Sequence, residues 1–170
     1  MRFSIVIPTY NRKDLLRRCL AAATNQDYPD YEVIVVDDGS TDGTGEMVQR
    51  EFPQVRYIRQ EPNRGPAAAR NRGIEAATGE IVAFTDDDCL VPPDFLACLA
   101  DGYRRHPEVV GAGGYLEAPD EVLAHNPFAQ YEAYVSHVVY KAGPIEYIGG
   151  FECPAGGTCA MSYRRDVLLE

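Results

Sequence analysis

The amino-acid sequence predicts an α/β fold in which helices cover both faces of a mostly parallel sheet. Short runs rich in β-branched residues alternate four times with stretches of helical periodicity, which is the order that parallel strands and crossover helices require. The run at residues 32–36 is apolar at nearly every position, as expected of a strand buried on both faces. The chain has 170 residues, of which 45% are hydrophobic, and this is enough for one domain with its own core.

The first strand and helix lie at the N-terminal end of this pattern. Residues 3–7 form an apolar run that we expect to stop as a strand at Pro8. Asn11 is the predicted N-cap of a helix, with Asp14 three residues later, and apolar side chains then recur at helical spacing as far as Ala23.

Three further strands with their helices follow. We expect strands at residues 32–36, 55–59 and 81–84, a helix from Asp42 to just before Pro53, and another helix over residues 66–77. Pro66 suits the first turn of a helix because its missing N–H has no helical partner there, and Gly79 suits the end of one. Successive strand and helix units imply parallel pairing, because crossover connections join parallel strands.

The second half of the chain has a less regular pattern. Its predicted elements are a helix over residues 93–103, a fifth strand over 109–116, a helix over 120–140, a glycine-rich loop over 149–157, a short extended run over 159–163 and the start of a helix over 164–170. In the 120–140 segment aromatic side chains share helical spacing with histidines and charges, so its periodicity is the weakest.

The net charge and the cysteines exclude several classes of partner and location. A formal net charge of -10 would repel nucleic acid, so no nucleic acid is expected to bind. The five cysteines are odd in number and form no Cys-x-x-Cys pair, which favours reduced thiols and a cytoplasmic location. No apolar run approaches the roughly 20 residues that cross a bilayer, so any place at the cytoplasmic face of a membrane would depend on parts outside this segment.

Three polar turns each follow directly after a predicted strand. Residues 8–11 are Pro-Thr-Tyr-Asn, residues 37–40 are Asp-Asp-Gly-Ser, and residues 86–88 are three aspartates. The carboxyl ends of parallel strands meet at one edge of an open sheet, where doubly wound proteins bind their ligands. We therefore expect polar side chains from distant parts of the chain to converge on one cleft.

The three consecutive aspartates point to a divalent cation. Carboxylates so close together repel one another strongly unless a cation or abundant water offsets their charge. Carboxylate oxygens select a hard ion such as Mg²⁺ or Mn²⁺, and in an extended turn the first and third side chains, Asp86 and Asp88, point the same way. The alternative is an acidic, solvated turn ahead of Pro92.

The turn at residues 37–42 and the arginines after it leave two interpretations open. A carboxylate of this turn could accept hydrogen bonds from a nucleobase or from ribose hydroxyls, but the same residue types suit any strand-to-helix turn. Between residues 56 and 72 five arginines stand against a single acid, Glu61, and arginines beside a glycine-containing helix start suit phosphate. A solvated surface, with arginine stems lying over the sheet, is the alternative.

Taken together, these segments resemble the inverting glycosyltransferases of family 2, which have the GT-A fold, a Rossmann-like α/β arrangement. The similar stretches are SIVIPTYNR (residues 4–12), EVIVVDDGSTDGT (32–44), NRGPAAARNRGIEAATGEIVAFTDDD (63–88) and GGTCAMSYRR (156–165). They occur in the order of the family and cover nearly the whole chain. The resemblance implies that a nucleoside diphosphate sugar, with UDP favoured, donates its sugar with inversion to an acceptor hydroxyl on a sugar, lipid or protein.

The resemblance also implies roles for individual residues. In the family the first two turns hold the base and the ribose, and the matching residues here are Pro8, Thr9, Asn11, Asp37 and Asp38. Arg70 matches an arginine that contacts the nucleotide. Asp86 and Asp88 match the Asp-x-Asp motif that holds Mn²⁺ or Mg²⁺ on the diphosphate, and Asp87 between them is a candidate substrate contact. Many relatives continue this motif with a further acid, where this chain has Cys89.

The general base of the family lies in an acidic motif downstream of the segment that matches residues 156–158. We therefore expect residues 1–170 to be a single nucleotide-sugar-binding domain that stops before this motif, with the general base beyond Glu170. Glu152 and Asp166 are accordingly left unassigned as bases.

Two other classes of function remain as alternatives. A non-catalytic nucleotide-sugar-binding module would carry the same turns without the base. An Mg²⁺-dependent phosphoacceptor signalling domain would also gather aspartates at strand ends, but it needs a lysine at a late strand end. The lysines of this chain, Lys13 and Lys141, fall outside the predicted strands.

Overall fold

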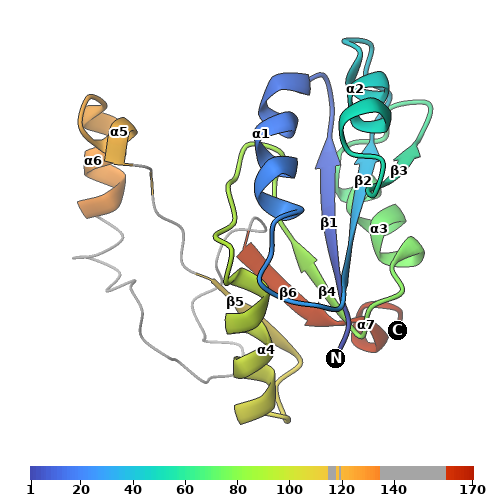
Figure 1. The fold of residues 1–170 in the computed structure, drawn as a ribbon, viewed down its shortest axis with the longest axis vertical. Coiled ribbons are helices and arrows are strands. Elements are labelled where there is room, and N and C mark those ends of the chain that lie inside the picture. Colours follow the sequence, from blue (N-terminus) through green and yellow to red (C-terminus); the bar gives the residue numbers. More distant parts are fainter. Residues whose placement is uncertain (115–117, 119, 135–159) are drawn as a thin grey trace.

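The computed structural model describes residues 1–114, 118, 120–134 and 160–170 (Figure 1). In this part of the chain the strands form one six-stranded sheet with the order β3-β2-β1-β4-β6-β5. The strands are β1 (Phe3–Thr9), β2 (Tyr31–Asp37), β3 (Arg56–Arg59), β4 (Ile81–Phe84), β5 (Gly111–Gly113) and β6 (Met161–Arg164). The helices are α1 (Lys13–Ala23), α2 (Thr44–Glu51), α3 (Pro66–Ala76), α4 (Phe95–Arg105), α5 (Asp120–Leu123), α6 (Pro127–Tyr134) and α7 (Arg165–Leu168).

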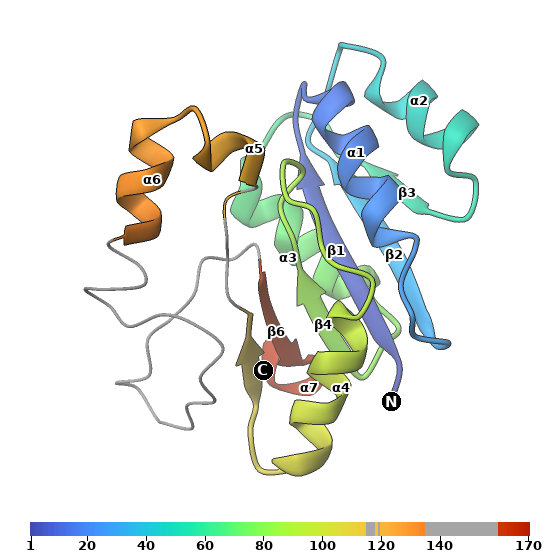
Figure 2. The ribbon, with the colours of Figure 1, turned by 60° about the vertical axis from the view of Figure 1, so that its left-hand side comes forward.

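The sheet is mostly parallel, as the alternation of strands and helices predicts. β1 pairs in parallel with β2 and β4, and β2 pairs in parallel with β3. β6 runs antiparallel to both of its neighbours, β4 and β5. The predicted fold class is confirmed: helices cover both faces of the sheet (Figure 2).

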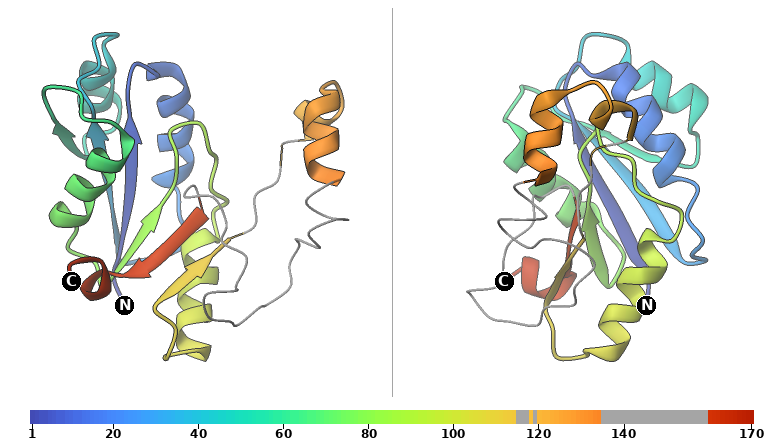
Figure 3. Two further views of the ribbon diagram at one scale, coloured as in Figure 1. Left: turned by 180° about the vertical axis from the view of Figure 1, so that it is seen from behind. Right: turned by 90° about the vertical axis from the view of Figure 1, so that its left-hand side faces the viewer.

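Side chains of the strands alternate between two apolar layers. Ile5 and Ile7 of β1 pack with residues of α1, α2 and α4 on one face. Val6, which lies between them, packs with residues of α3 on the other face. The view from behind the sheet has α3 in front of β1 and β2 (Figure 3). Burial on both faces explains why the central strands are apolar at nearly every position.

α3 packs directly against the central strand because residue 73 is a glycine. A methyl group at Gly73 would overlap the side chain of Val6 in β1. The helix begins at Pro66, with Gly65 before it at φ 86°, a left-handed conformation that favours glycine. This close packing brings the first turns of α3 to the edge where β4 ends.

β1 continues through Pro8 to Thr9, so the prediction that it stops at Pro8 is wrong. The Val6 carbonyl accepts a hydrogen bond from Thr85 on the β4 side, and the Thr9 carbonyl accepts one from Asp38 on the β2 side. Backbone groups alternate between the two neighbouring strands, so Pro8 faces the β4 side, like Val6. Because β4 ends at Phe84, which pairs with Val6, the missing N–H of Pro8 has no ladder partner to lose.

The start of α1 also differs from the prediction. Arg12, and not Asn11, is the N-cap residue, and the helix begins at Lys13. Asn11 has a φ of 52°, a left-handed conformation that asparagine adopts more readily than most residues. Its side chain binds the neighbouring turn instead of capping the helix.

In the second half, the helix predicted over residues 93–103 is α4 (Phe95–Arg105), and the elements that follow are shorter or divided. β5 covers Gly111–Gly113 instead of residues 109–116. The segment predicted as one helix contains two, because Asn126 caps α6 by accepting hydrogen bonds from Phe128 N (3.0 Å) and Ala129 N (3.2 Å), and Pro127 opens that helix. The predicted loop at 149–157 and residues 135–140 lie outside the described residues. β6 and α7 correspond to the short run and the helix start predicted at the end of the chain.

Candidate functional site

The three aspartates after β4 have different surroundings. Asp86 accepts a hydrogen bond from Arg70 of α3, with Arg70 Nη2 2.6 Å from Asp86 Oδ1. Asp88 lies on the α1 side, where Arg12 Nη1 is 3.1 Å from Asp88 Oδ2. The side chains of Asp86 and Asp88 are 31% and 47% exposed, whereas that of Asp87 is 6% exposed. The acidic turn therefore presents its first and third carboxylates to solvent and buries the second.

Asp87 ties the acidic turn to the end of β1. Thr9 donates its hydroxyl hydrogen to Asp87 Oδ2 at 2.8 Å, and Arg12 Nη1 lies 3.1 Å from Asp87 Oδ1. Burial raises the pKa of Asp87 above its ordinary value, and the hydrogen bonds from Thr9 and Arg12 oppose that shift. Thr9 and Asp87, which the sequence assigns to substrate binding, contact each other in this structure.

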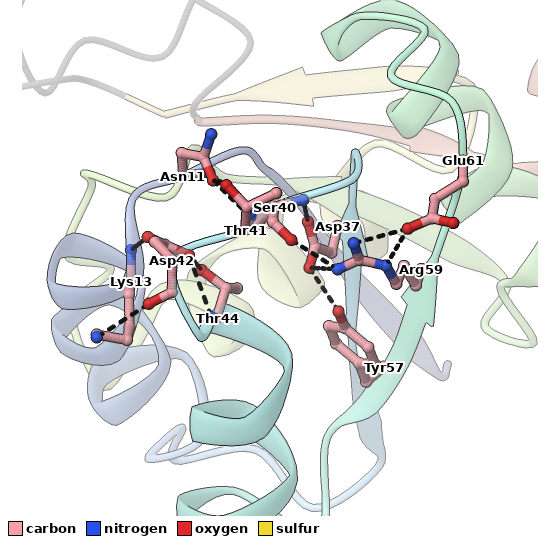
Figure 4. Close-up of polar contacts among 10 residues, drawn as sticks. All are labelled: Asn11, Lys13, Asp37, Ser40, Thr41, Asp42, Thr44, Tyr57, Arg59 and Glu61. Atoms are coloured by element: carbon pink, nitrogen blue, oxygen red, sulfur yellow. Dashed lines mark hydrogen bonds and ion pairs between the residues drawn. The ribbon is translucent and has the colours of Figure 1, made fainter.

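Asp37 at the end of β2 is fully buried and bonded to protein groups (Figure 4). Its Oδ1 accepts a hydrogen bond from Ser40 N at 2.8 Å, while its Oδ2 accepts the Tyr57 hydroxyl hydrogen and lies 3.4 Å from Arg59 Nη1. Burial, together with the hydrogen bond to Asp37, raises the pKa of Tyr57 to about 12. Asp37 therefore organises the turn and the adjacent strand β3.

Asn11 connects the first polar turn to the second. Its backbone N–H donates to Ser40 Oγ at 2.8 Å, and its Oδ1 accepts from Thr41 N at 2.7 Å. Nearby, Asp42 accepts from Lys13 N at 3.0 Å and from the Thr44 hydroxyl at 2.6 Å (Figure 4). The two turns that the sequence assigns to base and ribose thus lie side by side.

Asp38 holds the loop that leads into α3. This carboxylate is 3% exposed and accepts hydrogen bonds from the Gln60 side chain, from Arg64 N at 2.8 Å and from Gly65 N at 2.7 Å. The loop in turn positions the helix that carries Arg70. Pro8 lies beneath this edge, buried in β1 opposite Val36.

The arginines between residues 56 and 72 do not form one positive cluster. Arg56 donates to the Ala76 carbonyl at 2.6 Å, Arg59 pairs with Glu61, and Arg72 pairs with Glu75. Arg70 differs from these three because its partner belongs to the acidic turn. Arg56 and Arg72 therefore fit the alternative of a solvated surface, whereas Arg70 fits a role at the site.

Two open depressions adjoin this edge. One, of about 320 Å³, lies beside α3 and is lined mainly by apolar side chains, with Arg70 and Asn71 as its polar members. The other, of about 330 Å³, lies between α2 and β3 and includes Tyr57, Arg59 and Glu46. Arg70 thus borders both the acidic turn and a concave surface of the α3 face.

The site also includes three residues that were not predicted from the sequence, namely Arg12, Tyr57 and Gln60. Arg12 has a signal in the sequence, since it directly follows the Pro-Thr-Tyr-Asn turn. Tyr57 and Gln60 have none, because they reach Asp37 and Asp38 only through the pairing of β2 with β3.

The acids near the end of the sequence lie away from the acidic turn. Asp166 belongs to α7, which begins where Arg165 N donates to the Glu80 carbonyl ahead of β4, at the edge opposite the acidic turn. Glu170 follows the same helix and is exposed. Neither acid is therefore a base for this site in the structure, and Glu152 lies outside the described residues. That the general base lies beyond Glu170 stays a prediction.

The acidic turn fits a hard divalent cation in the chemistry of its donors. Asp86 and Asp88 offer partly exposed carboxylate oxygens, which Mg²⁺ and Mn²⁺ prefer. Among the described residues no three His, Cys, Asp or Glu side chains are arranged to hold a metal by themselves. A cation here would therefore complete its coordination with ligand phosphates and water, as Mg²⁺ commonly does.

Polar side chains at the carboxyl ends of β1, β2 and β4 are the arrangement by which doubly wound α/β proteins bind ligands. The family model described as glycosyl transferase family 2 matches residues 4–168. The chain therefore belongs to glycosyltransferase family 2, and its fold is the GT-A fold.

Individual relatives agree with this membership. The glucosyl-dolichyl phosphate glucuronosyltransferase of Haloferax volcanii is 30% identical over 175 residues, which cover 100% of this chain and 55% of that protein. The mannosyltransferase PcManGT from Pyrobaculum calidifontis, solved with GDP-Man and Mn²⁺, is 30% identical with a TM-score of 0.70 over 99% of this chain and 46% of that one. S. aureus TarS 1-349, solved with UDP-GlcNAc, shares the fold at 22% identity and a TM-score of 0.67, over 99% of this chain and 47% of that one.

Two further observations concern membrane-spanning helices and the cysteines. In the described part of the chain no helix combines the length and the apolar character needed to cross a membrane. Among the described cysteines, Cys19 is buried and Cys98 is exposed, and neither forms a disulfide.

Proposed function

We propose that this chain binds a nucleoside diphosphate sugar together with Mn²⁺ or Mg²⁺ and serves the transfer of the sugar, with inversion, to an acceptor hydroxyl. The observation that carries the proposal is the pairing of Arg70 with Asp86 at the edge where Asp88 is also exposed. Membership of glycosyltransferase family 2 supplies the class of reaction. A UDP donor is favoured by the sequence resemblance, and GDP is the nucleotide of the Pyrobaculum calidifontis complex.

In this proposal Asp86 and Asp88 hold the cation, and Arg70 faces the diphosphate. The cation, when bound, acts as a Lewis acid that offsets the negative charge building on the leaving diphosphate. Arg70 adds a fixed positive charge at the same edge, where preorganised groups lower the barrier most effectively. For this contact the guanidinium must exchange part of its pairing with Asp86 for phosphate oxygens, which arginine forks bind well.

In this proposal the site keeps its shape through four polar residues of the first two turns, namely Thr9, Asn11, Asp37 and Asp38. Their side chains fix the two turns and the loop before α3, and the exposed backbone of those turns then meets the base and the ribose. The cytoplasmic location is proposed from the sequence, whose five cysteines are odd in number and form no Cys-x-x-Cys pair. The acceptor is a sugar, lipid or protein hydroxyl, and a non-catalytic donor-binding module remains the second candidate function.

The test is calorimetric titration of UDP and GDP in Mn²⁺ and in EDTA. We expect nucleotide affinity to fall at least about tenfold, or roughly 1.4 kcal/mol, in EDTA and in Asp88→Ala. Arg70→Ala should weaken binding as well, because a positive charge at the diphosphate is lost. Arg56→Ala is the matched control, since the Arg56 guanidinium donates to the Ala76 carbonyl at the end of α3, and it should leave affinity unchanged. Equal affinity in Mn²⁺ and EDTA would overturn the metal assignment.

Turnover is tested separately. Release of UDP or GDP from the matching donor sugar, in the presence of a panel of acceptors, distinguishes a transferase from a binding module. Donor binding without any product in the complete protein would favour the non-catalytic alternative.

A further inference from the structure

Arg12 bridges two of the three aspartates at the end of β4. Its Nη1 lies 3.1 Å from Asp87 Oδ1 and 3.1 Å from Asp88 Oδ2. Because Arg12 is the N-cap residue of α1, its backbone is fixed relative to the end of β1. One guanidinium therefore joins the acidic turn to the rigid start of a helix.

The two contacts of Arg12 differ in how easily they can be exchanged. Asp87 is buried and also bonded to Thr9, so the loss of its contact with the half-exposed Arg12 costs more than the loss of a contact between two surface groups. Asp88 is 47% exposed, and an ion pair at such a surface position contributes little to stability. The contact with Asp87 is thus the anchor, and the contact with Asp88 is the exchangeable one.

The opposite side of the turn has a comparable pair. Arg70 lies 2.6 Å from Asp86, so the three consecutive carboxylates are flanked by one arginine from the start of α1 and one from α3. These two arginines offset the mutual repulsion of the aspartates without any metal ion. A cation that uses Asp88 must therefore compete with Arg12.

We propose that Arg12 is a positioning residue that anchors the acidic turn through Asp87 and sets its affinity for the divalent cation by competing for Asp88. The inference rests on the proposed function in one respect, namely that the cation binds at Asp86 and Asp88. It adds that, in the metal-free protein, the Arg12 guanidinium pairs with Asp88, and that this contact breaks when the cation binds Asp88.

Removing the charge of Arg12 should have opposite effects on the two states. Without metal, the variant should unfold at a lower temperature, because Asp87 loses its cation and the aspartates repel one another. With metal, it should bind the cation more tightly, because a competitor and a nearby positive charge are gone. Coulomb's law at a few ångströms in a largely aqueous setting gives an increase of about tenfold in affinity. A purely structural role would weaken binding instead.

The experiment measures free Mn²⁺ by its electron paramagnetic resonance signal in titrations at saturating UDP, and thermal unfolding in EDTA. Arg12→Gln removes the charge, and Arg12→Met does so with a side chain of similar length in case the glutamine variant does not fold. Arg12→Lys keeps the charge and should bind Mn²⁺ as the original protein does. Arg72→Gln is the matched control, because it removes an exposed helical ion pair with Glu75 on α3.

Each outcome decides between the two proposals. Tighter Mn²⁺ binding and lower stability in EDTA for Arg12→Gln or Arg12→Met, with Arg12→Lys and Arg72→Gln unchanged, support the competition. Unchanged or weaker Mn²⁺ binding in the uncharged variants, while the original protein binds Mn²⁺, overturns it and leaves the proposed function intact. No Mn²⁺ binding by the original protein overturns the metal-dependent function and the inference with it.

Discussion

Asp38 is a buried carboxylate that accepts hydrogen bonds from the loop between β3 and α3. Gln60, Arg64 N and Gly65 N all donate to its two oxygens, so it receives three N–H groups at the point where the chain enters α3. An ionised carboxylate is the side chain that accepts this many donors and offers none in return. We expect the position of α3 to depend on it.

Asp38→Asn should therefore destabilise the fold. The amide replaces one acceptor oxygen by a donor, so the hydrogen bond from Arg64 N or from Gly65 N is lost, although Gly65 N keeps a second acceptor in Asn63 Oδ1 at 3.2 Å. A hydrogen bond to a charged acceptor contributes about 1.5–3 kcal/mol, so the free energy of unfolding in urea should fall by up to about that amount.

Asp101→Asn serves as the control for this substitution. Asp101 makes an exposed pair with Arg105 on α4, and surface changes of this kind stay within about 0.5 kcal/mol. If both variants unfolded like the original protein, the hydrogen bonds of Asp38 would contribute nothing to stability.

For individual residues, the sequence predicts which side chains lie at the site better than it predicts what each side chain contacts there. Asp37 and Asp38 lie at the predicted edge, yet their carboxylates contact protein groups in the structure. Their partners Tyr57 and Gln60 come from β3 and the loop after it, and a single sequence carries no signal for that pairing.

At the level of elements, α3 is held against β1 by the absence of a side chain at Gly73. Gly73→Ala should destabilise the protein by about 1–3 kcal/mol, because the added methyl overlaps Val6 and the packed core cannot absorb it without shifts. Thermal or urea unfolding measures the effect.

Gly102 is the matched control within α4. A methyl group there has no neighbouring atom within 4 Å, and alanine favours a helix over glycine by up to about 1 kcal/mol. Gly102→Ala should therefore be neutral or stabilising. A Gly73→Ala variant as stable as Gly102→Ala would contradict the close packing of α3 on β1.

Elements with strong apolar periodicity or clear signals at their ends are predicted well, and the weakly periodic segment from residue 120 is not. The central strands, α1 and α4 follow from apolar patterns that burial on one or both faces requires, and α3 follows from Pro66 at its start and Gly79 after its end. The segment from residue 120 fails because Asn126 and Pro127 start a new helix, a capping signal that outweighs the weak aromatic periodicity.

At the scale of the whole molecule, α5 and α6 stand apart from the sheet (Figures 1 and 3). Neither core cluster of the described residues includes a member of these helices, and Phe128 and Tyr131 of α6 are 83% and 62% exposed. Replacing residues 118–134 by a flexible linker should therefore leave UDP affinity within about threefold, as measured by calorimetry. A loss of tenfold or more would mean that this segment takes part in donor binding.

The parallel pairing of the first four strands and the gathering of three turns at one edge follow from the sequence, because crossover connections join parallel strands. The position of β6 does not follow. It is inserted antiparallel between β4 and β5, and its four residues carry too little pattern to specify a neighbour.

The reversal of β6 has an evolutionary consequence. Gly113 at the end of β5 pairs with Met161 at the start of β6, and Ser162 pairs with Ala83 near the end of β4. The connection between β5 and β6 therefore leaves and re-enters the sheet at the same edge as the acidic turn. Insertions and deletions within that connection can change the chain attached at this edge without altering a single strand pairing, so selection can diversify the acceptor side of the proposed reaction while the proposed donor side stays as it is.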